Sequence, residues 1–376
     1  MKHYFFCTYF DRNYCDKGLA LYESLVKHVP DFTLYILCLD EETYYTLKGL
    51  NLSSIKLIRL FELEEREPLF FATRKNRSLI EYYFTSTPVF IRNLMTFYPE
   101  IDIISYIDAD MYLFSSIDPA YKEMGNASIF IVEHRFPPEL EDRLIYGRFN
   151  VGYLSFRNDD EGRRCLDDWS RDCIAWCYDL VEGDKFADQK YLDKWENEYN
   201  GLCVSKNIGI NTAPWNVSQY NIELREEQFL VNGTPLLIYH FHGLKPDIVH
   251  KNLYCFDNHL REYFRSSGSE QHELFKLYSQ YGLSLINSQE YALQNNHFKV
   301  IGKDIRYNTD INKKIGAILL FEVIDEIKKI RRDKCISDMI IILKVYKRSK
   351  KPVNLTKINK FIKRFFFKEG YQKDDN

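Results

Sequence analysis

The sequence lacks any apolar run of about 18 residues, the length at which a helix becomes a candidate for crossing a membrane. It also lacks an apolar segment with a small-residue cleavage site near its N-terminus, so we expect neither a transmembrane helix nor a signal peptide. No internal repeat and no long low-complexity linker interrupts the chain. With 45% hydrophobic and 28% charged residues, we expect a cytoplasmic protein with a sizeable core.

Cysteines paired at metal-binding spacing are also missing. The nine cysteines are scattered, odd in number and contain no Cys-x-x-Cys pair. Cys173 and Cys177 are four residues apart, which places both on one face of a helix, but a zinc site would need more ligands nearby. We expect reduced thiols in a cytosolic protein rather than a metal site at these positions.

Positive charge is scarce in the body of the chain. The sequence has 51 Lys+Arg and 54 Asp+Glu, of which 20 and 10 fall from residue 301 onward, which leaves 31 and 44 before it. The net charge is therefore near −13 before residue 301 and near +10 after it. An acidic body argues against nucleic acid as a partner, whereas a basic tail is free to meet an anionic surface.

Strand and helix patterns alternate through the first 130 residues. A helix is predicted over 17–29 and a second helical region over 77–98, interrupted at Pro88. Strands are predicted over 3–10, 32–39, 53–61, 101–108 and 127–133. This alternation favours the α/β class, with a mainly parallel sheet covered on both faces. We assign residues 1–260 to this catalytic domain and 261–376 to a helical, basic C-terminal region.

Two aspartates, Asp108 and Asp110, follow the apolar segment 103–107. Strand interiors disfavour aspartate, and two neighbouring carboxylates repel each other unless a positive charge lies between them. In α/β sheets, ligands bind at the carboxyl ends of strands, where these residues are predicted to lie. Two such carboxylates are suited to holding Mg²⁺ or Mn²⁺. The alternative is a polar strand end or a helix cap.

A second candidate segment, LLIYHFHGLKP, covers residues 236–246. His240 and His242 follow an apolar run there and precede Gly243 and Lys245. An imidazole can complete the coordination of Mn²⁺, a glycine lets the backbone approach a phosphate, and a lysine supplies positive charge. The alternative is a buried histidine pair packed by Phe241. One metal–diphosphate site would use both candidate segments.

These segments resemble the retaining GT-A glycosyltransferases, and in particular glycosyltransferase family 8, over about residues 3–250. Family 8 carries a YLDAD-like strand end and a late H-x-x-G-x-x-K-P-W segment. This chain has Tyr106-Ile-Asp-Ala-Asp110 and His240-Phe-His-Gly243-Leu-Lys245-Pro246, which is one residue shorter between Gly and Lys and lacks the Trp. Three further segments fit the resemblance in the family's order: Asp11-Arg-Asn13-Tyr14, Phe149-Asn150-Val151-Gly152 and Ala187-Asp188-Gln189.

The resemblance implies a GT-A fold, in which helices flank the mixed sheet of the nucleotide-diphospho-sugar transferases. It implies transfer of a sugar, with retention, from a nucleoside diphosphate-sugar (UDP-sugar by default) to a glycan or lipid-linked acceptor. The metal, Mn²⁺ or Mg²⁺, would be held by Asp108, Asp110 and His240. The remaining roles follow the family's motifs: Asp11, Asn13 and Tyr14 at the nucleotide base, Asn150 and Gly152 near the donor sugar, Gly243 and Lys245 at the diphosphate, and Asp188 and Gln189 at the reacting centre.

Several of these positions have a structural alternative. Asp188 and Gln189 also fit a helix N-cap with a solvated neighbour. Arg77 and Arg92 either reach the donor or form surface ion pairs, and we favour the latter. Trp215 is expected in a loop as an exposed acceptor platform. The other three tryptophans, Trp169, Trp176 and Trp195, are expected in the core.

The C-terminal segment KINKFIKRFFFK, residues 357–368, has apolar residues at helical spacing between lysines and arginines. This pattern is typical of a helix at an anionic lipid surface, which would suit bacterial surface polysaccharide assembly at the inner face of the cell membrane. The alternative is a helix docked on the chain's own acidic body. Rival functions are a sugar nucleotidyltransferase of the same fold and a non-catalytic nucleotide- or glycan-binding protein. A nucleic-acid binder is disfavoured.

Overall fold

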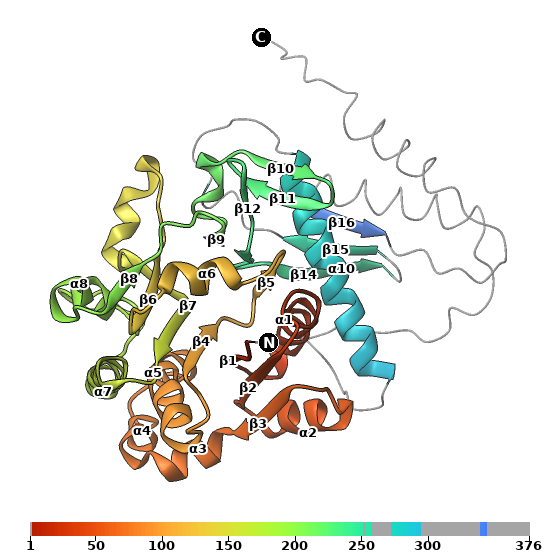
Figure 1. The fold of residues 1–376 in the computed structure, drawn as a ribbon. Helices are drawn as coiled ribbons and strands as arrows, with labels where there is room; N and C mark the ends of the chain where they lie inside the picture. The colour runs from red at the N-terminus through yellow and green to blue at the C-terminus, as the bar shows by residue number, and fades with distance from the viewer. Residues whose placement is uncertain (1, 251–252, 258–262, 264–271, 295–338, 344–376) are drawn as a thin grey trace, which may run out of the picture.

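The computed structural model describes residues 2–250, 253–257, 263, 272–294 and 339–343, and its centre is a seven-stranded sheet (Figure 1). The strand order is β3-β2-β1-β4-β7-β6-β8. These strands are β1 (Tyr4–Phe10), β2 (Phe32–Cys38), β3 (Ile55–Arg59), β4 (Ile103–Ile107), β6 (Ile129–Glu133), β7 (Phe149–Arg157) and β8 (Leu202–Val204). The first four in this order pair in parallel, while β7 runs antiparallel to both β4 and β6. The predicted α/β class with a mixed sheet is confirmed.

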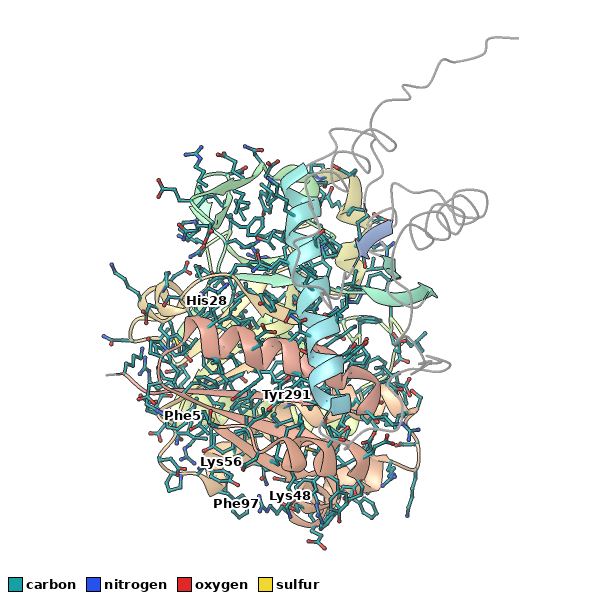
Figure 2. The ribbon with its side chains drawn as sticks, turned by 90° about the vertical axis from the view of Figure 1, so that its right-hand side faces the viewer. Phe5, His28, Lys48, Lys56, Phe97 and Tyr291 are labelled. Atoms are coloured by element: carbon teal, nitrogen blue, oxygen red, sulfur yellow. The ribbon has the colours of Figure 1, made fainter. Side chains whose placement is uncertain are left out.

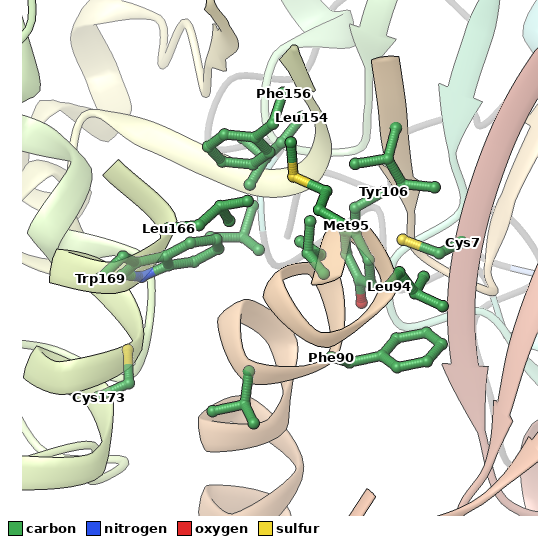
Figure 3. Close-up of a cluster of buried hydrophobic side chains, with 14 of the residues drawn as sticks. Cys7, Phe90, Leu94, Met95, Tyr106, Leu154, Phe156, Leu166, Trp169 and Cys173 are labelled. Carbon is green, nitrogen blue, oxygen red and sulfur yellow. The ribbon is translucent and has the colours of Figure 1, made fainter. Parts of the chain in front are cut away.

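Helices cover both faces of this sheet. The described helices are α1 (Cys15–His28), α2 (Glu41–Leu50), α3 (Leu60–Arg66), α4 (Pro68–Thr73), α5 (Leu79–Phe97), α6 (Asp118–Met124), α7 (Asp160–Ala175), α8 (Trp195–Glu198) and α10 (His272–Gln294). Figure 3 shows one face, where Phe90 and Leu94 of α5 and Trp169 of α7 pack toward the strands. On the other face, Leu25 of α1 and Leu47 of α2 belong to a second buried cluster. Burial on both faces explains why the strands are almost continuously apolar.

The helix predicted over 77–98 is real, but its predicted interruption at Pro88 is wrong. The helix α5 runs without a break from Leu79 to Phe97 with Pro88 inside it. A capping box fixes its start, because Ser78 Oγ accepts from Glu81 N (3.4 Å) and Glu81 Oε2 accepts from Ser78 N (2.7 Å). A proline removes one helical hydrogen bond, and the burial of the turns on both sides of Pro88 outweighs that loss here.

A small sheet above the main one carries the second candidate segment. Its strands are β5 (Met111–Leu113), β13 (Ile238–His240) and β9 (Ile210–Thr212), in the order β5-β13-β9. The strand β13 runs antiparallel to β5, with His240 opposite Met111. Two further small sheets consist of β10 (Ile222–Arg225), β11 (Gln228–Val231) and β12 (Thr234–Pro235), and of β14 (Lys245–His250), β15 (Leu253–Asp257) and β16 (Met339–Leu343). Four 3-10 helices complete the described elements: η1 (Arg12–Tyr14), η2 (Pro138–Tyr146), η3 (Lys190–Lys194) and η4 (Val217–Gln219).

The helix α10 packs against α1 and the small sheet, although it lies C-terminal to the boundary predicted near residue 260. Figure 2 shows α10, with Tyr291 labelled, crossing α1, which ends at His28. The ring of Tyr281 stacks on Phe241 with centroids 3.8 Å apart. No helix among the described residues is both long and apolar enough to cross a membrane. The tail segment 357–368 lies outside the described residues, and its lipid-surface role stays a prediction.

Candidate metal and nucleotide site

The two aspartates of the DAD segment lie at the junction between the main sheet and the small one. The strand β4 ends at Ile107, and the backbone N–H of Asp108 then donates to Gly152 O of β7 (2.9 Å). A tight turn follows, in which Met111 N donates to Asp108 O (3.0 Å), and β5 begins at Met111. The two carboxylates therefore sit where the chain leaves one sheet and enters the next, as the strand-end prediction requires.

His240 meets these carboxylates because β13 pairs with β5. Phe241 N donates to Asp110 O (2.9 Å), which holds the end of β13 against the DAD turn. His240 Nε2 lies 3.1 Å from Asp110 Oδ1 and 3.7 Å from Asp108 Oδ2. The structure thus brings together three residues that the sequence analysis grouped from positions about 130 residues apart, and the alternative of a histidine pair packed only by aromatic rings does not describe this contact.

Burial and charge act against each other on this cluster. Burial favours the neutral form of Asp110, yet the charges of His240 and Lys17 and the hydrogen bond from His240 outweigh it, and its pKa is lowered. Burial likewise favours neutral His240, but Asp110 and Asp108 raise its pKa above the ordinary value. For Asp108, burial dominates and the pKa is raised. With no ion bound, the cluster therefore favours a carboxylate at Asp110 beside a protonated His240.

His242 adds a fourth potential ligand that the sequence analysis did not assign to the metal. Ligand atoms of Asp110, His240 and His242 all lie within 4.8 Å of one another. The signal was present in the His-x-His spacing, because alternation along a strand places residues i and i+2 on the same face. The strand β13 ends at His240, and the chain then turns through Gly243 (φ 76°), with the ring centroids of His240 and His242 5.8 Å apart.

The donor set fits a divalent ion. Carboxylate oxygens suit Mg²⁺ and Mn²⁺, and imidazole nitrogen is accepted by Mn²⁺ and later transition metals. Ligands about 2.1 Å from an octahedral ion lie about 3 Å apart when they are neighbours and about 4.2 Å apart when they are opposite. The distances of 3.1 and 3.7 Å from His240 Nε2 to Asp110 and Asp108 fall in this range.

Gly152 leaves room for His240 because it carries no Cβ. A Cβ on Gly152 would come 2.5 Å from Met111 Cε, 2.6 Å from Asn150 Oδ1 and 2.9 Å from His240 Nδ1. Asn150 is itself held in place, since its Oδ1 accepts from Gly152 N (3.0 Å) and its Nδ2 donates to His134 Nε2 (3.3 Å). The Asn150–Gly152 segment, expected as a turn near the donor sugar, lies instead in strand β7 and supports one wall of the histidine site.

We expect Gly152→Ala to weaken Mn²⁺ binding by about tenfold or more and to destabilise the fold by about 1–3 kcal/mol, because the added methyl displaces His240. Calorimetric Mn²⁺ titration and thermal unfolding measure both effects. The matched control is Gly49→Ala on the exposed side of α2, which should leave Mn²⁺ affinity unchanged and not destabilise the helix. Unaltered Mn²⁺ affinity in Gly152→Ala would contradict this account of the site.

The Asp11-Arg-Asn13-Tyr14 segment forms the 3-10 turn η1 between β1 and α1. Asp11 caps this turn, accepting from Asn13 N (2.9 Å) and Asn13 Nδ2 (3.0 Å). Tyr14 is 43% exposed and lies under the ammonium group of Lys17, which is 3.9 Å from its ring centroid. The turn thus presents a partly free aromatic ring at the same end of the sheet as Asp110.

Asp188 lies in a buried setting rather than at a solvated helix cap. Its side chain accepts a hydrogen bond from Thr87 of α5, and the Thr87 hydroxyl in turn contacts Tyr9 OH (3.2 Å). Burial, with a further contribution from the charge of Asp108, raises the pKa of Asp188 to about 7. Ala187 before it has φ 47°, a left-handed conformation that costs a non-glycine residue energy.

The side-chain amide of Gln189 donates a hydrogen bond from Nε2 to the backbone Tyr146 O (2.9 Å). It occupies the N-cap position of η3 but makes no side-chain capping hydrogen bond. Among the described side chains, the N-cap alternative therefore does not explain either Asp188 or Gln189.

The remaining candidates have structural roles. Trp215 is 4% exposed, so its prediction as an exposed platform is wrong. Its ring stands edge-on to His240, with centroids 5.0 Å apart, and its Nε1 donates to His134 O (3.0 Å).

Arg92 pairs with Glu67, as favoured, while Arg77 is buried over the ring of Tyr178. Trp169 and Trp195 are core residues, while Trp176 is only partly buried. The side chain of Lys245 lies outside the described part of the structure.

Comparison with known proteins places the chain in a family. No family model matches the sequence. Over 248 residues it is 31% identical to the uncharacterized protein YfnD of Bacillus subtilis, which covers 65% of this chain and 78% of YfnD. The chain belongs to the family of YfnD. YfnF of the same organism is 29% identical over 248 residues, covering 64% of this chain and 81% of YfnF.

Similar solved structures are glycosyltransferases. The galactosyltransferase LgtC, solved with donor and acceptor sugar analogues, has a TM-score of 0.44 at 18% identity and covers 64% of this chain and 87% of its own. Mouse xyloside xylosyltransferase 1 has a TM-score of 0.42 at 15% identity, covering 64% and 98%. GlyE of Streptococcus pneumoniae has a TM-score of 0.42 at 14% identity, covering 77% and 64%.

Proposed function

We propose that the chain is a metal-dependent glycosyltransferase of the GT-A fold. It would transfer a sugar from a nucleoside diphosphate-sugar, with UDP-sugar as the first choice, to a glycan or lipid-linked acceptor. One observation carries the proposal: Asp108 and Asp110 at the end of β4 converge with His240 and His242 at the end of β13. Two carboxylates and two imidazoles at strand ends form a donor set for a divalent ion next to a face where ligands bind.

The proposed chemistry develops negative charge on the departing nucleoside diphosphate. A bound Mn²⁺ or Mg²⁺ would neutralise that charge, which is the contribution expected of a metal in such a transfer. In the proposal, Asp108, Asp110 and His240 hold the ion and His242 completes its shell. The turn with Asp11, Asn13 and Tyr14 faces the nucleotide base, and Gly243 and Lys245 face the diphosphate.

The reacting centre is assigned to Asp188 and Gln189, with Asn150 and Gly152 beside the donor sugar. The burial of Asp188, its raised pKa and the left-handed Ala187 before it support this assignment, because perturbed carboxyl groups and strained backbone cluster at active sites. Retention by attack on the same face of the sugar, as in glycosyltransferase family 8, is the mechanism we propose. The resemblance of the five sequence segments supports it.

The test is a panel of nucleoside diphosphate-sugars incubated with the full chain, with Mn²⁺ or with a chelator. We expect metal-dependent release of the nucleoside diphosphate from one donor, and faster release when the acceptor is present. Formation of pyrophosphate from a nucleoside triphosphate and a sugar phosphate would instead establish a nucleotidyltransferase. Binding without turnover of any donor would establish a non-catalytic protein and overturn the proposal.

The proposed setting is bacterial surface polysaccharide assembly at the cytoplasmic face of the membrane, with residues 357–368 binding anionic lipid. The basic amphipathic pattern of that segment supports it. Vesicles containing anionic lipid should retain the full chain and release a chain that ends at residue 349. Equal retention of both would rule out this role for the tail.

A further inference from the structure

Lys17 is a buried lysine at the candidate site with no role in the assignments so far. It lies in the first turn of α1 and is 5% exposed. Lysine is almost never fully buried unless its charge is paired, because removing an ammonium group from water is costly. Its Nζ lies 3.8 Å from Asp110 Oδ2 and 3.9 Å from the ring centroid of Tyr14.

A charge count shows why Asp110 is not a sufficient partner for Lys17. In the structure, Asp110 also contacts His240 at 3.1 Å. A divalent ion held by Asp108 and Asp110 would take both carboxylate charges for itself. The ion and the two aspartates then sum to zero, and among the described residues no other carboxylate lies within ion-pair distance of the buried Lys17 ammonium. Such a group requires an anion.

The position of Lys17 indicates which anion. On one side it contacts Tyr14, from the turn proposed to face the nucleotide base, and on the other it contacts Asp110, from the metal cluster. In a metal-bound nucleoside diphosphate, the diphosphate is the part that joins the nucleoside to the ion. The first turn of α1 adds the positive end of a 14-residue helix dipole at the same place.

We propose that Lys17 binds the diphosphate of the donor and stabilises the nucleoside diphosphate as it leaves. This inference rests on the proposed function, since it takes a nucleoside diphosphate as the ligand. Lys17 moves from Asp110 toward the diphosphate when the ion is present, so the site carries a permanent cation from helix α1 in addition to the ion. A lysine approaching from α1 also does not depend on the shortened spacing between Gly243 and Lys245.

The test compares three variants of the full chain by calorimetric titration with Mn²⁺, then with pyrophosphate and UDP in saturating Mn²⁺, and with uridine. Lys17→Met removes the charge but keeps the length, and Lys17→Arg keeps the charge. Lys56→Met is the matched control. Lys56 lies in β3, the edge strand of the main sheet, and pairs with Glu100 at 3.0 Å.

We expect Lys17→Met to weaken pyrophosphate and UDP binding by about 10- to 100-fold, the loss of one charge-assisted contact. Uridine binding should not change, and Mn²⁺ should bind as tightly as before or more tightly, because a cation that competes for Asp110 is gone. Lys17→Arg should bind pyrophosphate and UDP within a few-fold of the wild type. Lys56→Met should bind them as tightly as the wild type does.

Three outcomes would overturn the inference, and they are distinguishable. If the wild type binds Mn²⁺ and pyrophosphate and Lys17→Met binds both equally well, Lys17 only neutralises Asp110 and the inference alone is wrong. If the wild type binds neither pyrophosphate nor UDP in the presence of Mn²⁺, the proposed function fails and the inference with it. Weaker Mn²⁺ binding in Lys17→Met with unchanged pyrophosphate affinity would assign Lys17 to the metal cluster instead.

Discussion

Replacing Asp110 with asparagine is expected to abolish measurable Mn²⁺ binding and to reduce donor turnover by about 1,000-fold or more. Asp110 is the centre of the cluster, with His240 Nε2 at 3.1 Å and Lys17 Nζ at 3.8 Å. Asparagine keeps the size and one acceptor oxygen but removes the charge that a hard cation requires. A factor of 1,000 corresponds to about 4 kcal/mol, a magnitude that metal stabilisation of a leaving group can supply.

The same substitution should also cost stability at neutral pH. The pKa of Asp110 is lowered in the folded protein, so its carboxylate stabilises the fold above its unfolded pKa, and this contribution is lost as the pH falls through the folded pKa. Asp110→Asn leaves Lys17 and His240 facing each other without the carboxylate, and thermal unfolding at pH 7 should show a lower midpoint than for the wild type.

Asp102→Asn is the matched control for this prediction. Asp102 precedes the same strand, β4, and its Oδ1 accepts from Ile103 N at 2.7 Å at the end of β4 opposite to the site. It should leave Mn²⁺ affinity and turnover at wild-type levels. Wild-type Mn²⁺ affinity in Asp110→Asn would remove the metal assignment on which the proposed function depends.

The part of the site that the sequence predicted depends on local patterns. The apolar run 103–107 predicts a strand, and chemistry at strand ends then singles out Asp108 and Asp110. His240 was predicted because a similar apolar run precedes it. The chemistry of a metal–diphosphate site and the resemblance of motifs joined the two segments, and the pairing of β5 with β13 provides the physical contact.

Lys17 and His242 were not predicted as parts of the site for a different reason. Lys17 belongs to a segment whose periodicity predicts only an amphipathic helix, and its approach to Asp110 depends on how α1 packs beside β5. His242 lies two residues after His240, the spacing that places two strand residues on one face, but the family motif assigns a role to His240 alone. The packing of α1 cannot be read from local sequence, since tertiary contacts decide it.

The two wrong predictions, a break at Pro88 and an exposed Trp215, have a common origin. Pro88 predicts a break, but the buried turns around it hold α5 together. Trp215 lies in a polar loop sequence that predicts exposure, yet its ring packs among His134, His240 and His242. In both cases a local signal was overridden by burial against residues that are distant in the sequence.

Replacing Asp188 with asparagine is expected to stabilise the metal-free protein at high pH while lowering donor turnover. Burial raises the pKa of Asp188 to about 7, with the charge of Asp108 adding to the effect and the Thr87 hydrogen bond opposing it. The folded state therefore binds the proton more tightly than the unfolded state, whose aspartate carboxyl has the ordinary pKa of 3.8. Wild-type stability should fall as the pH rises from about 4 through 7, because the folded state must then hold a buried charge.

The size of the expected stability gain follows from the raised pKa of Asp188. One unit of pKa corresponds to about 1.4 kcal/mol, so Asp188→Asn should exceed the wild type by a few kcal/mol at pH 8.5 and by little at pH 4. Urea unfolding at both values, with a chelator present, measures this difference. Asp167→Asn on the exposed side of α7 is the control and should show no gain that depends on pH.

A gain in stability together with a loss of turnover would support the assignment of Asp188 to the reacting centre. A carboxyl group that is costly to bury and contributes nothing to folding persists only if its function requires it, so asparagine should gain stability and lose turnover together. Equal stability of Asp188→Asn and the wild type at pH 8.5 would show that ionisation of Asp188 does not destabilise the folded protein. A stability gain with full turnover would place the reacting centre elsewhere, and Gln189 would lose its assignment as well.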